Sequence, residues 1–171
     1  MFDLDWIDEQ LAIGGSFTTE HAVHLAAEHR VRAVVDVRSE CCDDAVALRE
    51  HGIDLHHLPT HDLAAIAPEM LESGVEWVSA RLDRGERVYI HCEHGVGRSA
   101  LLTWCVLVAR GDEPLSALRR LKDARERVAP SPNQIDAFVR WAAVFKRRTD
   151  APWELPPFEP ITRIAYRTSA R

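Results

Sequence analysis

The stretch HCEHGVGRS, residues 91–99, constrains what this chain can fold into more than any other part of it. The apolar, strand-like run RVYI leads into it, and the apolar run SALLTWCVLVAR (99–110) continues from it with the length of a buried helix. A glycine-containing turn between a strand and a helix exposes successive backbone N–H groups beside a helix amino end, which attract a tetrahedral anion. The sequence therefore predicts an anion-binding loop between a strand and a central helix.

The residues of this loop suit a phosphate group. Gly95 and Gly97 permit backbone angles that other residues resist. Arg98, at the predicted start of the helix, can grip two phosphate oxygens with its planar guanidinium group. The residues predicted to surround the phosphate are Glu93, His94, Gly95, Val96, Gly97 and Arg98.

Cys92 is the predicted nucleophile of the loop. In its positive field the thiol should ionise well below a free cysteine pKa of about 8.5. A thiolate that points into an anion cradle is a nucleophile aimed at phosphorus. Ser99 can hydrogen-bond the sulfur, and His91 can fix the loop from behind.

A cysteine nucleophile also needs a proton donor for the leaving oxygen, and an Asp or Glu at the end of a neighbouring strand could supply it. Asp62 fits this requirement because it follows the predicted strand 54–59 on a polar turn. Asp36 is the competitor, since it also lies near the carboxyl end of a strand. Asp36 sits inside the run VVDVR, however, where we expect a buried carboxylate paired with an arginine.

The alternation of strands and helices predicts an α/β sandwich with a largely parallel central sheet flanked by helices. Such sheets place their sites at the carboxyl ends of the strands, so Cys92 and the loop after Pro59 should open on the same edge. Strands are predicted at 11–16, 32–38, 54–59 and 87–92, and helices at 19–30, 43–52, 68–85, 99–110, 115–128 and 133–148.

The domain organisation follows from length and composition. A chain of 171 residues is most simply one domain, here predicted as a catalytic domain at 1–149. From 150 to 171 the composition changes to proline and aromatic residues. This tail is expected either to pack as an extended arm or to be mobile.

HCEHGVGRS matches the His-Cys-x5-Arg-Ser signature of the cysteine-dependent protein tyrosine phosphatases. The order and lengths of the elements resemble the compact dual-specificity branch over residues 5–146. The resemblance implies the phosphatase sandwich fold, a phosphocysteine intermediate, no metal and no other cofactor, and it puts Asp62 in the place of the general acid. APSPNQIDAF is similar to the family's Pro-Asn segment, so Asn133 or Gln134 is expected to approach the phosphate or its water.

Other functions stay open. VVDVR resembles the Asp-x-Arg element of the rhodanese-like sulfurtransferases, but their cysteine loop is usually one residue shorter and needs no separate acid. An inactive phosphate-binding module usually lacks the Cys, the Arg or the acid, and all three are present here. Among substrates, phosphotyrosine proteins are favoured, with phosphoserine or phosphothreonine proteins next. The alternative is a non-protein substrate, namely an inositol phosphate, a phospholipid or a phosphosugar.

The charge and hydrophobicity of the chain exclude some classes of binding partner. The formal net charge of −6 argues against a nucleic-acid partner, and no apolar run is long enough to span a bilayer, so we expect a cytoplasmic protein. The partner is then a phosphorylated protein or a small phosphomonoester; the oligomeric state is not predicted. The cysteine loop holds no lysine and carries the acidic Glu93, which favours singly phosphorylated substrates over polyphosphoinositides.

No metal site is predicted, because the spacing of cysteines and histidines matches no zinc motif. Cys41 and Cys42 are expected to be ordinary free thiols, with a redox partnership of either one with Cys92 left open. The histidines expected in surface or core roles are His21, His24, His51, His56 and His57.

Overall fold

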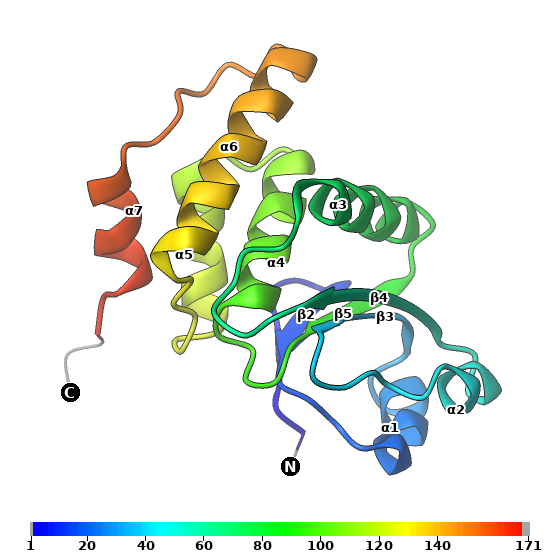
Figure 1. Ribbon diagram of the computed structural model, residues 1–171. Coiled ribbons are helices and arrows are strands. Elements are labelled where there is room, and N and C mark those ends of the chain that lie inside the picture. Colours follow the sequence, from blue (N-terminus) through cyan, green and yellow to red (C-terminus); the bar gives the residue numbers. More distant parts are fainter. Residues whose placement is uncertain (1, 169–171) are drawn as a thin grey trace.

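A computed structural model describes residues 2–168 as a five-stranded sheet covered by helices on both faces (Figure 1). The strands are β1 (Leu4–Trp6), β2 (Leu11–Gly14), β3 (Val31–Arg38), β4 (Asp54–Thr60) and β5 (Arg87–His91), and they lie in the order β1-β2-β5-β3-β4. Within the described residues, only the edge strand β1 is antiparallel to its neighbour. The predicted α/β sandwich with a mostly parallel sheet is therefore confirmed, and β1 is a strand that the sequence analysis did not predict.

One face of the sheet carries the smaller helical layer, α1 (Ala22–Ala27) and α2 (Ala45–Glu50), which lie together in Figure 1. Successive strand residues point to opposite faces, and Val34 and Tyr89 point to this one, where they pack with Leu25 of α1 and Leu48 of α2. The predicted helix 19–30 is shorter than expected. It consists of a 3₁₀ turn at Thr19–His21 and then α1.

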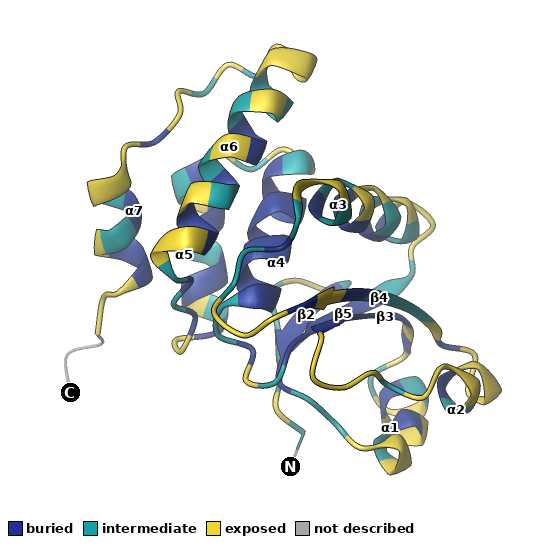
Figure 2. Cartoon of the chain, in the orientation of Figure 1, coloured by how far each residue is buried: buried dark blue, intermediate teal, exposed yellow. Residues whose placement is uncertain are grey.

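The opposite face carries the main core. Its helices are α3 (Pro68–Asp83), α4 (Arg98–Ala109), α5 (Pro114–Ala124) and α6 (Pro132–Thr149). Helix α4 lies between the sheet and the outer helices, and eleven of its twelve residues are buried, which explains why its sequence is apolar nearly all round (Figure 2). The predicted central helix after the cysteine loop is thus present.

The C-terminal tail contains a further helix, α7 (Phe158–Ala165), which lies beside α5 (Figure 1). Ile161, Ile164 and Ala165 are buried in the main core. The composition of the tail predicted an extended arm or a mobile segment, so the helix was not expected. Its apolar residues at i, i+3 and i+4 form the stripe of an amphipathic helix, but the prolines around it concealed that pattern.

The register of the sheet brings three polar residues to one level near its carboxyl edge. Asp36 of β3 is the pairing partner of His91 in β5 and of His57 in β4. The loops that leave this edge are the cysteine loop after β5, the loop after β3 and the loop after β4. No helix in residues 2–168 has both the length and the apolar composition needed to cross a membrane.

Candidate active site

The cysteine loop runs from the end of β5 to the first turn of α4, as the sequence predicts. Cys92 is 3% exposed, and its Sγ accepts a hydrogen bond from the backbone N–H of Gly95 at 3.2 Å and lies 3.3 Å from Oγ of Ser99. Burial opposes ionisation, but the Ser99 hydroxyl and the N–H groups of the loop outweigh it, so the pKa of the Cys92 thiol lies below its ordinary value. The loop therefore holds the sulfur in a fixed position and favours its ionised form.

The two loop glycines are needed for different reasons. Gly95 has a φ of +64°, and a Cβ there would come within 2.5 Å of the backbone of Gly14. Gly97 has a φ of −119°, which other residues adopt, so the expectation of unusual backbone angles is wrong at this position. A Cβ at Gly97 would instead lie 2.6 Å from Oε1 of Gln134. Gly97 thus serves the close approach of another chain segment.

Arg98 is held by its two terminal nitrogens. Nη1 and Nη2 each donate to one oxygen of the Glu40 carboxylate at 2.7 Å, and Nη1 also donates to the carbonyl of Thr60 at 2.8 Å. The side chain is 2% exposed, yet its Nε has no hydrogen-bond partner among residues 2–168. Buried N–H donors are almost always paired, so this orphaned donor indicates a place for a ligand oxygen.

Asp62 lies in the loop after β4, on the same edge as Cys92. Its Oδ1 is 3.4 Å from Nη2 of Arg98, and its side chain is 70% exposed. A hydrogen bond of 2.9 Å between Oγ of Ser39 and Nδ1 of His61 ties this loop to the loop after β3. The carboxyl group thus lies beside the guanidinium of Arg98 and is open to solvent.

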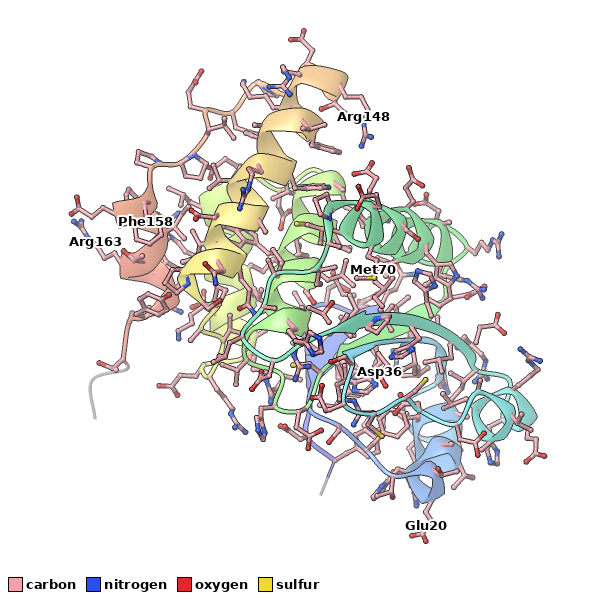
Figure 3. The ribbon with its side chains drawn as sticks, viewed as in Figure 1. Glu20, Asp36, Met70, Arg148, Phe158 and Arg163 are labelled. Carbon is pink, nitrogen blue, oxygen red and sulfur yellow. The ribbon has the colours of Figure 1, made fainter. Side chains whose placement is uncertain are left out.

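Asp36 is buried and paired with Arg38, as the sequence analysis expected. Its Oδ1 accepts from Nε of Arg38 and its Oδ2 accepts from Nη2, both at 2.9 Å. Burial opposes ionisation of Asp36, but the hydrogen bonds from Arg38 hold the pKa of this carboxyl below its ordinary value. Figure 3 labels Asp36 where β3 ends. A carboxylate so fully engaged has no proton to give to a leaving group.

His91 contacts both the cysteine loop and the loop after β3. Its Nδ1 is 3.3 Å from the carbonyl of Cys92, and its Nε2 is 2.7 Å from Oδ2 of Asp43. Asp43 also pairs with Arg38 through Oδ1 at 2.8 Å. The imidazole therefore connects Cys92 to the loop after β3.

Glu40 and Asp43 are two functional candidates that the sequence analysis missed. Both lie in the loop after β3, where the sequence SECCDD offered only a cluster of acidic residues as a signal. Arg98 donates two hydrogen bonds to Glu40, which lower the pKa of its carboxyl to about 2, so Glu40 stays ionised at any ordinary pH.

Arg125 is a third residue that the sequence analysis missed. Its Nε donates to the carbonyl of Gly95 at 2.8 Å, and its Nη2 donates to the carbonyl of His94 at 2.9 Å. The same guanidinium pairs with Asp3 at 2.8 Å and Asp5 at 2.6 Å. Arg125 therefore holds the cysteine loop against the N-terminal segment.

Helix α5 ends at Ala124, before its predicted end at 128, because Arg125 adopts an extended backbone.

Gln134 and Asn133 lie at the start of α6 but in different surroundings. Gln134 is buried, and its Nε2 donates a hydrogen bond to the carbonyl of Ala64 at 3.0 Å. Its side chain also fills the space that a Cβ at Gly97 would need. It joins the cysteine loop to the loop of Asp62. Asn133 is exposed.

The rim of the loop is less negative than its sequence suggests. Glu93 places Oε2 3.3 Å from Nη1 of Arg38, although its side chain remains 41% exposed. His94 is exposed, and the carbonyl of Val96 accepts a hydrogen bond from the N–H of Ala129 at 2.9 Å. The charge that was expected to repel a second phosphate is therefore partly neutralised.

Known protein families and sequences are similar to this chain. The family model for "Dual specificity phosphatase, catalytic domain" matches residues 15–143. The human "Phosphatidylglycerophosphatase and protein-tyrosine phosphatase 1" is 25% identical over 142 residues, which cover 77% of this chain and 71% of that protein. "Protein tyrosine phosphatase PRL-1" of Leishmania major is 29% identical over 113 residues, which cover 61% of this chain and 62% of that protein.

Solved structures share the fold. The crystal structure of PTPMT1 in complex with PI(5)P has a TM-score of 0.80 at 20% identity, covering 86% of this chain and 99% of that one. The crystal structure of Tk-PTP in the active form has a TM-score of 0.75 at 23% identity, covering 82% of this chain and 97% of that one.

Proposed function

Because this chain belongs to the dual specificity phosphatase family, we propose that it hydrolyses phosphate monoesters through a phosphate bound covalently to Cys92. One observation carries the proposal. The activated sulfur and the orphaned buried Nε of Arg98 lie at either end of one glycine-containing loop. A phosphoryl group bound in that loop would have its phosphorus next to Sγ of Cys92 and one of its oxygens within reach of Nε of Arg98.

The chemistry has two steps. In the first, the Cys92 thiolate attacks phosphorus, the S–P bond forms as the P–O bond to the alcohol breaks, and Asp62 gives its proton to the departing oxygen. In the second, water attacks phosphorus and gives a proton to Asp62, and the S–P bond breaks to release inorganic phosphate and restore the thiolate. Arg98 and the loop N–H groups stabilise the charge on the equatorial oxygens in both steps.

The proposed substrates carry a single phosphate, with phosphotyrosine proteins first and phosphoserine or phosphothreonine proteins second. The cysteine loop contributes no lysine that could bind further phosphates, and the chain as a whole is acidic. The partial pairing of Glu93 with Arg38 reduces the predicted repulsion but adds no free positive charge. We further propose a cytoplasmic location, which fractionation of cells that produce the chain would test.

A phospholipid is the second candidate substrate. One curated relative is named for activity on phosphatidylglycerophosphate as well as on protein tyrosine, and this chain is 25% identical to it. In addition, a groove of about 940 Å³ begins at Ala65, three residues after Asp62, and runs between α3 and α6. Leu71, Trp141 and Val144 give it an apolar lining that could hold an acyl chain.

The proposal is tested with an aryl phosphate in the presence of a metal chelator. We expect hydrolysis that chelation does not reduce, and no transfer of sulfur from thiosulfate to cyanide. Sulfur transfer without phosphate release would overturn the proposal in favour of a sulfurtransferase, and binding without turnover would indicate an inactive phosphate-binding module.

The substrate class is decided by kcat/KM for phosphotyrosine peptides, phosphoserine peptides, inositol phosphates, phosphosugars, phosphatidylglycerophosphate and phosphatidylinositol polyphosphates at one pH. We expect phosphotyrosine peptides to rank first and Glu93→Lys to raise the relative efficiency on polyphosphoinositides. A wild-type preference for polyphosphoinositides would contradict the argument from charge. A preference for phosphatidylglycerophosphate that is lost in Val144→Glu would support the second candidate.

A further inference from the structure

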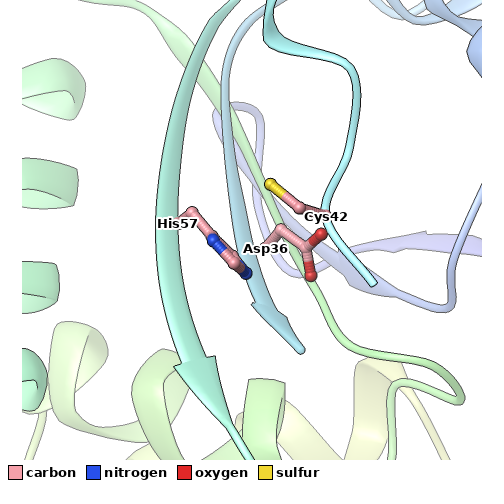
Figure 4. A group of neighbouring side chains, drawn as sticks. All are labelled: Asp36, Cys42 and His57. Carbon is pink, nitrogen blue, oxygen red and sulfur yellow. The ribbon is translucent and has the colours of Figure 1, made fainter. Parts of the chain in front are cut away.

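Outside the phosphate loop, the side chains of Asp36, Cys42 and His57 converge beside the carboxyl ends of β3 and β4 (Figure 4). Asp36 and His57 are pairing partners on the two strands, and Cys42 comes from the loop that follows β3. One donor atom from each residue lies within 4.8 Å of the other two. Around a tetrahedral Zn²⁺ such donors would be roughly 3.5 Å apart, so only a small closure is needed.

The chemistry of the three donors selects the metal. A thiolate, an imidazole and a carboxylate together suit Zn²⁺, whereas Mg²⁺ and Ca²⁺ prefer oxygen ligands alone. A second group, formed by Asp36, Asp43 and His91, overlaps this one but offers no sulfur, and its histidine is already bonded to Asp43. The group that contains Cys42 is therefore the better zinc site.

His57 is held as metal-binding histidines usually are. Its Nε2 lies 2.6 Å from the carbonyl oxygen of Arg38, which can only accept a hydrogen bond. Nε2 is therefore the donor of this hydrogen bond, and Nδ1 is the nitrogen that would bind a metal. A backbone carbonyl that fixes the tautomer in this way is the common outer partner of a zinc-bound imidazole.

The local charge also favours a dication. The guanidinium of Arg38 faces three carboxylates, those of Asp36, Asp43 and Glu93, at 2.9, 2.8 and 3.3 Å. This leaves an excess of negative charge beside the sulfur of Cys42. Oδ1 of Asp36 accepts from Nε and the backbone N–H of Arg38, and Oδ2 accepts from Nη2 of Arg38 and the N–H of Asp43. A metal bound through one oxygen would displace a donor there and leave the other oxygen to the guanidinium.

The site can be reached from solvent. Cys42 is exposed and lines a hollow of about 270 Å³ together with Arg38, Cys41 and Asp43, so a metal would meet its sulfur before it met the buried Asp36. The thiol would release its proton to water as the metal binds. No metal was predicted here, because the three ligands are spread over two strands and a loop and match no zinc spacing.

We propose that Asp36, Cys42 and His57 bind Zn²⁺ and that zinc at this site lowers the activity of the neighbouring phosphate loop. The second half rests on the proposed phosphatase function. The link is the loop after β3, in which Glu40 holds Arg98 and Asp43 holds His91 on either side of Cys42. A Cys42 drawn toward β3 and β4 would move both carboxylates.

Binding is tested with Co²⁺ as a spectroscopic probe on the purified full chain, followed by competition with Zn²⁺. A cobalt–thiolate charge-transfer band should appear at one equivalent and disappear when zinc is added. Cys42→Ser should abolish the band, and His57→Gln should weaken binding at least about tenfold. Cys41→Ser is the matched control, since it removes the adjacent exposed thiol, and it should keep the band.

Cys92→Ser is a second control, used only in the cobalt-binding experiment because it removes the proposed nucleophile. It should also keep the cobalt–thiolate band. A band that survives in Cys42→Ser, or one that disappears in Cys41→Ser or Cys92→Ser, would overturn the zinc site. Circular dichroism of each variant shows whether it is folded, and the exposed position of Cys42 makes a folding defect unexpected.

Regulation is tested separately through activity. Without metal, Cys41→Ser and Cys42→Ser should hydrolyse an aryl phosphate as fast as the wild type. Zinc should inhibit the wild type and Cys41→Ser, and Cys42→Ser should need at least about tenfold more zinc for the same inhibition. Equal inhibition of all three would overturn the regulatory half. An inactive metal-free wild type would overturn the proposed function and this half with it, while the cobalt band would still decide the zinc site.

Discussion

Glu40 grips Arg98 through both carboxylate oxygens, each 2.7 Å from a terminal nitrogen of the guanidinium. These two bonds turn the guanidinium so that its remaining donor, Nε, is buried without a partner among residues 2–168. The residue that orients Arg98, the arginine proposed to bind phosphate, thus comes from a different loop, 58 positions earlier in the chain. An arginine held in this way is preorganised to bind one phosphate oxygen through Nε, whereas the sequence predicted a grip on two oxygens.

Glu40→Gln should lower kcat/KM for an aryl phosphate by about 10–100-fold, because the neutral amide no longer fixes the guanidinium in its phosphate-binding position. The pKa of Glu40 is about 2, so the defect should be the same from pH 5 to pH 8. Steady-state kinetics across that range provides the test. Glu20→Gln, at an exposed position far from the site, is the control. Wild-type kinetics in Glu40→Gln would show that Arg98 needs no such support.

Asp62→Asn should lower kcat by about 10²–10⁴-fold for substrates whose leaving group has a high pKa, because the amide cannot protonate the departing oxygen. The loss should be smaller for good leaving groups, which depart without a proton. A series of aryl phosphates measures this dependence. A defect that does not vary with the leaving group would remove Asp62 from the role of acid.

Ser99→Ala should move the acidic limb of the kcat/KM profile about 1 pH unit toward alkaline pH. Burial raises the pKa of the Cys92 thiol, but the Ser99 hydroxyl and the loop N–H groups lower it by more. With a depressed pKa, the thiolate is present above that pKa and is lost as the pH falls through it. Without the Ser99 hydrogen bond the pKa rises, so activity is lost at a higher pH. Ser73→Ala, exposed on α3, should leave the limb in place.

A direct titration of the thiol tests whether the acidic limb of the kcat/KM profile reports the ionisation of Cys92. The rate of Cys92 alkylation by iodoacetate against pH should give the same pKa as the kinetic limb in the wild type and in Ser99→Ala. An unmoved limb in Ser99→Ala would contradict the assignment of Ser99 as a partner of the thiolate.

Arg125→Ala should lower the free energy of unfolding by about 2–4 kcal/mol. The change leaves Asp3, Asp5 and two loop carbonyls without their donor. The loss is below that expected for a fully buried ion pair because the two carboxylates are nearly half exposed. Urea denaturation measures it. Arg127→Ala, which removes an exposed arginine near Asp3, should change stability by less than about 0.5 kcal/mol.

The sequence predicted what depends on neighbours along the chain. HCEHGVGRS holds Cys92, Arg98 and Ser99 within nine residues, so their proximity follows once a strand precedes and a helix follows. The place of Asp62 follows from a rule of parallel sheets, because it comes after a strand that ends at the same edge. The alternation of strand-like and helix-like runs predicted the α/β sandwich fold.

The sequence did not predict contacts that depend on tertiary structure alone. Glu40 meets Arg98 across 58 positions and Arg125 meets Gly95 across 30, and nothing in the local pattern distinguishes either from an ordinary surface charge. Helix α7 was missed because the prolines around it favour an irregular segment, although packing of Ile161 and Ile164 on the core stabilises the helix. Burial of an apolar face outweighed local propensity there.

The central claim is that phosphate passes through the sulfur of Cys92. Rapid acid quenching of the Asp62→Asn variant with substrate, followed by mass spectrometry of the peptide that contains Cys92, tests this claim most directly. We predict one phosphoryl group on Cys92 that forms within the first turnover and disappears as inorganic phosphate is released. Turnover without a covalent phosphate, or a phosphate on any other residue, would contradict it.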